Sequence, residues 1–82
     1  MAHHFHDNST QAQRNRLLDA LRCGPITTVE ARRNLDIMMP ASRIFELRED
    51  GFQIETVWVW QVTDANNAHR VARYVLMPVG AV

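Results

Sequence analysis

The sequence has no lysine, only one cysteine and no excess of charge of either sign. All nine basic residues are arginine, and nine acidic residues balance them, so the formal net charge is zero. Net charge therefore gives no general attraction to nucleic acid, and any such binding must depend on arginines gathered on one face. The single Cys23 cannot form an intramolecular disulfide, which agrees with a reducing compartment.

Long apolar runs are also lacking. No stretch approaches the roughly 20 residues that cross a bilayer, and the polar start MAHHFHDNST has no signal-peptide core. We therefore expect a cytoplasmic protein without a membrane partner. Eighty-two residues are enough for one small domain.

Catalytic and metal-binding patterns are missing as well. The sequence shows no paired acids, no nucleophile with a base, no Gly-rich phosphate loop and no metal-ligand spacing. We expect no enzyme, no cofactor and no structural metal. The histidines at positions 3, 4 and 6 fall in residues 1–9, which have no periodicity and are predicted to form a disordered tail.

Three helices are indicated by caps and apolar spacing. Ser9 or Thr10 caps a helix that Gly24-Pro25 ends, with Cys23 as a small residue at its end. Thr27 or Thr28, followed by Glu30, starts a short second helix. Pro40 suits the first position of a third helix, from Pro40 to Asp50, which Gly51 stops. The predicted apolar positions are Leu17, Leu18, Ala20, Leu21, Val29, Ala31, Leu35, Ala41, Ile44, Leu47 and the stem of Arg48.

After Gly51 the apolar period changes to two, which predicts a long strand over Phe52–Val62. Turn-forming residues fill Thr63–His69, and Val71–Met77 forms the return strand of a hairpin. Trp58 and Trp60 share a face with Ile54, so we expect them to cover the core. The alternative is that the strand is covered on both faces at a homodimer interface.

Helix, short helix, turn, helix and hairpin is the order of a winged helix-turn-helix, an α+β fold. The domain is predicted to span residues 10–77, followed by a tail at 78–82. The sequence contains the signatures GPIT, EA.R.L, A.RI.ELR..G, IET and ARY.L. Through these signatures it resembles the small winged helix-turn-helix domains of bacteriophages and prophages.

The resemblance implies a regulator, or an accessory factor of integration and excision, that binds double-stranded DNA on the nucleoid of a bacterial host cell. Its third helix would enter the major groove, and the hairpin wing would rest on the backbone or minor groove. The candidate DNA-binding residues are Thr28, Arg32, Arg33, Pro40, Ser42, Arg43, Glu46, Asn66, Asn67, His69, Arg70 and Arg73.

Two alternatives stay open at this point. Arg43 is expected either to contact guanine in the groove or to pair with Glu46 or Asp50 on its own helix. The neutral charge and the exposed Phe45, Val57 and Val59 would also suit a winged helix that binds a host protein instead of DNA.

Overall fold

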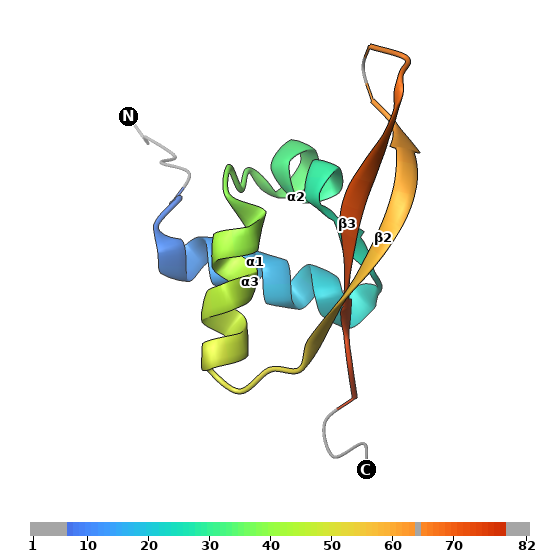
Figure 1. The fold of residues 1–82 in the computed structure, drawn as a ribbon. Helices are drawn as coiled ribbons and strands as arrows, with labels where there is room; N and C mark the ends of the chain where they lie inside the picture. Colours follow the sequence, from blue (N-terminus) through green and yellow to red (C-terminus); the bar gives the residue numbers. More distant parts are fainter. Residues whose placement is uncertain (1–6, 64, 79–82) are drawn as a thin grey trace, which may run out of the picture.

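The structure, a computed structural model, describes residues 7–63 and 65–78 of the 82-residue chain. Three helices and three strands follow one another along the sequence (Figure 1). They are α1 (Thr10–Cys23), β1 (Ile26–Thr27), α2 (Thr28–Leu35), α3 (Pro40–Glu49), β2 (Ile54–Val62) and β3 (Ala68–Leu76).

The caps of α1 and α2 follow the predicted chemistry. The Ser9 hydroxyl accepts from the Ala12 N–H at 3.1 Å. Thr27 and Glu30 form a reciprocal capping box, with distances of 2.9 and 3.1 Å between side-chain oxygens and backbone nitrogens. Each contact satisfies an N–H that the helix itself leaves without a partner.

Part of the predicted tail is tied to α1. The Arg16 guanidinium donates to the Asp7 carbonyl and the Asn8 side chain, and the Gln13 amide donates to the Asn8 carbonyl. Residues 7–9 therefore contact the first helix. The three clustered histidines and residues 79–82 lie outside the described residues.

The turn between α2 and α3 contains a core residue that its sequence position did not indicate. Asp36 adopts a left-handed conformation with φ of 54°, which reverses the chain directly after α2. The next side chain, Ile37, is fully buried. The turn is thereby fixed to the core, and it leads into Pro40 at the start of α3.

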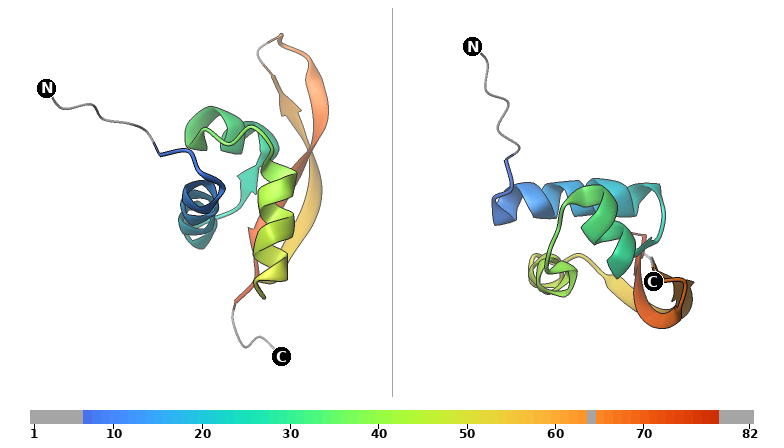
Figure 2. Two further views of the ribbon diagram at one scale, coloured as in Figure 1. Left: turned by 90° about the vertical axis from the view of Figure 1, so that its left-hand side faces the viewer. Right: turned by 90° about the horizontal axis from the view of Figure 1, so that it is seen from above.

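The sheet has one more strand than predicted. The strand order is β1-β3-β2, and all pairs are antiparallel. β1 consists of only two residues, which pair Ile26 with Tyr74 and Thr27 with Arg73. The three helices lie on one side of the sheet (Figure 2), and α1 packs behind α3.

The core lies between this side of the sheet and the helices. Its buried side chains are Leu17, Leu21, Ile37, Ile44, Leu47, Ile54, Ala72 and Tyr74. From the hairpin, only the end nearest the helices contributes, and Figure 1 shows the rest projecting past α2. The expectation that Trp58 and Trp60 cover the core is wrong, because they lie beyond the helices and are 56% and 74% exposed.

Replacement of Ile37 tests the role of the turn. Ile37→Ala removes a fully buried side chain, so we expect a loss of about 2–5 kcal/mol in the free energy of unfolding. Met38→Ala, at the exposed neighbouring position, should change it by less than about 0.5 kcal/mol. Urea denaturation followed by circular dichroism measures both. Equal effects of the two substitutions would show that the turn is not part of the core.

Candidate nucleic-acid interface

The outward face of α3 is a stripe of Ala41, Phe45, Arg48 and Glu49, all of which are exposed. These residues recur at helical spacing, opposite the buried Ile44 and Leu47. Ser42 is half-buried beside the stripe, and Pro40 is buried at the first helical position.

Arg43 faces α1 and not this outward stripe. Its side chain is 13% exposed, and its guanidinium nitrogens lie 2.9 and 3.1 Å from the two Glu46 carboxylate oxygens. The same carboxylate accepts from Arg14 of α1 at 2.8 Å. The ion-paired arrangement of Arg43 is thus the one present, and Glu46 joins two arginines across the junction of α1 and α3.

Two predicted members of the apolar stripe of the third helix, Ala41 and the stem of Arg48, are exposed instead. The Arg48 side chain crosses from α3 to β2. Its guanidinium donates to the Ile54 carbonyl at 2.7 and 2.9 Å and to the Thr56 hydroxyl at 3.0 Å. These hydrogen bonds could not be predicted from the sequence, because both acceptors lie on β2 and only the folded chain brings β2 beside α3.

Two further arginines are oriented in the same way, by neutral groups. Arg32 of α2 donates to the Met38 carbonyl at 3.2 Å. On β3, the Arg70 guanidinium lies 5.1 Å from the centre of the Trp58 ring, a cation–π distance. Within the described chain, Arg32, Arg48 and Arg70 form no salt bridge. We call these three residues the arginine triad.

Tyr74 of β3 is influenced by the charges of two members of the triad. Burial raises the pKa of its phenol above the ordinary value, and the positive charges of Arg48 and Arg32 act in the opposite direction. Arg32 and Arg48 therefore both lie within electrostatic reach of this phenol. Arg70 is four residues away from Tyr74 on the same face of β3, about 13 Å along the strand.

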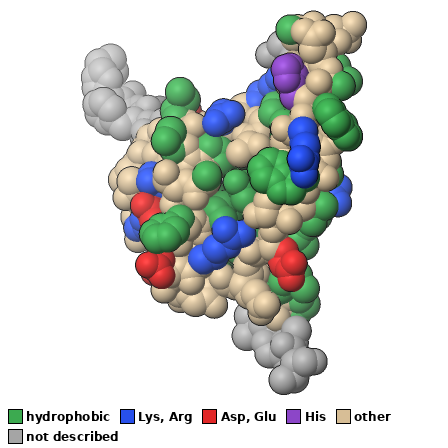
Figure 3. Space-filling model, in the orientation of Figure 1, with side chains coloured by type: hydrophobic (Ala, Val, Ile, Leu, Met, Phe, Trp, Pro, Cys, Tyr) green, Lys and Arg blue, Asp and Glu red, His purple; other side chains and the backbone are tan. Residues whose placement is uncertain are grey.

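The face that carries α3 and the hairpin is shown in Figure 3. Arginine side chains alternate there with apolar ones, and acidic side chains lie toward its margins. The exposed Met38, Met39 and Phe45 belong to α3 and the turn before it. This face is the candidate interface, because several arginine side chains are exposed on it although the whole chain is neutral.

The predicted residues of the hairpin divide between two faces. Asn66 and Asn67 form the exposed turn, where Asn66 has φ of 60° and both asparagines hydrogen-bond with Thr63. Alternation along β3 places Arg70 on the face of Tyr74, whereas His69 and Arg73 are on the opposite face. Arg73 was expected to extend the surface of Arg70, and the register instead separates the two.

The remaining predicted residues belong to α2. Thr28 is half-buried, and its hydroxyl donates to the Ala72 carbonyl of β3 at 3.3 Å. Arg33 is exposed in the last turn. Thr28 therefore joins the helix to the sheet, while Arg32 and Arg33 supply charge at the helix end.

Comparison with known proteins agrees with this geometry. A family model described as a winged helix-turn-helix domain matches residues 12–79. The chain belongs to this family. No curated protein and no solved structure matches it. Winged helix-turn-helix domains are DNA-binding modules and typically not enzymes, and the fold is the predicted α+β class with the short β1 added.

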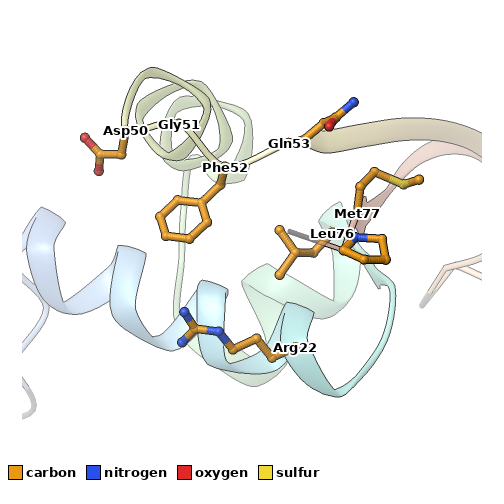
Figure 4. A pocket seen from close by; sticks show the side chains of 8 residues that line it. Arg22, Asp50, Gly51, Phe52, Gln53, Leu76 and Met77 are labelled. Atoms are coloured by element: carbon orange, nitrogen blue, oxygen red, sulfur yellow. The ribbon is translucent and has the colours of Figure 1, made fainter. Parts of the chain in front are cut away.

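Other features of this winged helix are less informative. A cavity of about 270 Å³ lies at the far end of α3, and Figure 4 shows Phe52 and Leu76 beside it with Arg22 opposite. Arg22 also lies 3.5 Å from Asp19. No helix in the described ranges is long and apolar enough to cross a membrane. Residues 7–63 and 65–78 contain no cluster of metal-ligating side chains.

The Glu46 ion pairs generate a stability prediction. Glu46→Gln leaves Arg14 and Arg43, which are only 19% and 13% exposed, without their shared counter-charge. We expect a loss of about 1–3 kcal/mol in the free energy of unfolding, measured by urea denaturation. Glu49→Gln, on the exposed stripe three residues further on, is the matched control and should have an effect below about 0.5 kcal/mol. Comparable losses in both variants would contradict the bridging role.

Proposed function

We propose that this winged helix binds double-stranded DNA in a sequence-specific manner, with α3 in the major groove and the hairpin against the backbone. The observation that carries the proposal is the arginine triad. Three guanidinium groups are held by neutral partners on the face of α3 and the hairpin, so their charges are oriented without being neutralised. Phosphate oxygens are the acceptors that such groups favour.

The dimensions and chemistry of α3 support this arrangement. A helix of ten residues is about 15 Å long and fits the major groove. Ala41 and Phe45 are suited to apolar contact with thymine methyl groups, and Arg48 can reach guanine or phosphate. Ser42 is at the N-terminal end of the helix, where base edges are nearest in related dockings.

The proposed contacts differ in part from those predicted by sequence. We retain Arg32, Arg33, Ser42, Asn66, Asn67 and Arg70 as contact residues and add Arg48. We assign Arg43 and Glu46 a supporting role, because their charges satisfy one another against α1. Thr28 and Pro40 then position helices, and His69 and Arg73 occupy the far face of the hairpin.

In the cell, we propose that the protein is a phage or prophage regulator, or an accessory factor of integration and excision, acting on the nucleoid in the bacterial cytoplasm. The resemblance of its signatures to small phage domains supports this role. We also propose that it binds as a homodimer, since two copies would double the number of arginine contacts to DNA.

A salt titration tests DNA binding directly. Fluorescence anisotropy would measure affinity for the DNA upstream of the protein's own gene and for an unrelated duplex. Each phosphate contact should contribute about 0.9 to the slope of log K against log salt. Specific binding predicts a higher affinity for one duplex, with a steep slope for both. The absence of binding to either duplex at low salt would disprove the proposal.

Arginine substitutions separate the two versions of the interface. Arg48→Ala and Arg70→Ala should each weaken binding about tenfold and lower the salt slope by about 0.9. Arg22→Ala, on α1 behind α3, is the matched control and should alter neither quantity. If Arg43→Ala weakened binding without loss of stability while Arg48→Ala had no effect, the sequence-predicted contacts would be correct instead.

Footprinting tests the proposed pairing on DNA. Two symmetry-related copies should protect half-sites whose centres lie about 10 base pairs apart, or a multiple of that distance. A single short protected segment, unchanged as protein concentration rises, would contradict binding as a dimer.

A second candidate function rests on the exposed apolar side chains. Met38 and Met39, in the turn before α3, and Phe45, on α3 itself, are 71%, 63% and 62% exposed. A partner protein, such as a host factor inhibited by a phage, could bury them. Binding of that kind should change little with salt and should be weakened more by Phe45→Ala than by Arg48→Ala.

A further inference from the structure

The outer edge of the hairpin is a long strand with no other strand beside it in the described chain, and Arg48 of α3 contacts only its start, at Ile54 and Thr56. β2 pairs with β3 along all nine of its residues, and the strand order β1-β3-β2 leaves its other edge free. Its backbone N–H and C=O groups on that side have no strand to pair with. Such an edge is a template for another strand.

Soluble proteins usually protect long edges by charge, proline or a bulge, and β2 has little of this. The segment Thr56–Val62 contains no charged residue, proline or glycine. The register runs without interruption from the pair Ile54–Leu76 to the pair Val62–Ala68, so no bulge bends the strand. Val57, Trp58, Trp60 and Val62 are between 40% and 74% exposed, and alternation places them on both faces.

We propose that β2 pairs antiparallel with β2 of a second copy of this chain, which joins the two sheets into one of six strands. In an antiparallel pair, directly opposite residues lie on the same face of the sheet. When the two strands are identical and related by a two-fold axis, that axis must therefore pass at the position of one residue and not between two residues. With Val59 at the two-fold axis, the segment Thr56–Val62 of one copy pairs with the same uncharged segment of the other copy. Each Trp58 then lies opposite Trp60 of the partner subunit, as a cross-strand aromatic pair.

The charges of the strand favour this partner and register. Glu55 is the only charged residue of β2. With Val59 at the axis, the two Glu55 residues are about 26 Å apart along the ladder, well beyond the screening distance at physiological salt. Centring near Thr56 would instead place the two carboxylates side by side.

The opposite edge of the sheet differs from β2. It consists of β1, which has only two residues and pairs with Arg73 and Tyr74, and of the part of β3 toward the hairpin tip, which carries Arg70. The two-fold axis is perpendicular to the sheet, so the helices and arginine triads of both copies lie on the same side. Arg70 is on β3, one strand in from the new junction, and its side chain stays on the sheet face.

The intact chain is tested without DNA, so the result is independent of the proposed DNA binding. Sedimentation velocity should give twice the chain mass of 9.5 kDa at high concentration. Both tryptophans of the protein lie in β2, so their fluorescence reports on this strand alone. On dilution, the emission should shift to longer wavelength as the dimer dissociates.

Variants locate the interface. Trp60→Lys and Val57→Lys add charge to exposed positions on the two faces of β2, and each should give a folded monomer with unchanged circular dichroism. Met38→Lys, equally exposed but away from the edge, should remain dimeric. Val57→Lys keeps the test informative if Trp60→Lys does not fold.

Three results on the mass of the protein and its variants would overturn the proposal. They are a wild-type chain that stays at 9.5 kDa at all concentrations, edge variants that remain dimeric, and dissociation by Met38→Lys alone. A tryptophan emission that does not change while the mass doubles would also overturn it, because the interface would then lie elsewhere.

Discussion

The carboxylate of Glu46 holds α3 against α1. It neutralises Arg14 of α1 and Arg43 of α3 at once, across the junction between the two helices. Because these charges are satisfied on the inner side of α3, the helix presents Ala41, Phe45, Arg48 and Glu49 outward. The buried Ile44 and Leu47 fix the same rotation through apolar packing. The polar and apolar contacts thus favour the same orientation of α3. A short helix must be held in one orientation if it is to contact bases in a groove.

The same logic explains how a neutral chain can have a basic face. Two arginines of α1 are matched with carboxylates, Arg14 with Glu46 and Arg22 with Asp19, whereas Arg16 is held by neutral oxygens. Those near the hairpin are held by carbonyl groups or an indole ring. Net charge is a sum over the whole molecule, whereas DNA would meet only one side of it. The absence of lysine fits this design, since the planar guanidinium can be fixed by several acceptors at once.

Local sequence signals predicted the helices well, because caps and stops act within a few residues. Thr27 with Glu30, Pro40, and Gly51 with its φ of 104° mark ends that the structure confirms. Features set by distant packing were not predictable in this way. Ile37 is buried only because the turn folds onto the core, and β1 exists only because two residues meet β3. The directions of Arg43 and Arg48 depend on which helix or strand lies beside α3, information that a helical wheel does not contain.

The length of the hairpin has a consequence for how such a domain can diversify. Ile54, Ala72 and Tyr74, nearest the helices, are packed into the core, while the residues toward the tip contribute no buried side chain to it. Substitutions there would cost little stability, so they can accumulate without first being compensated. Affinity for a new target or partner can therefore evolve at the tip while the helices and the lower hairpin stay unchanged. The residues that the fold requires are therefore separate from the residues that can be substituted during evolution.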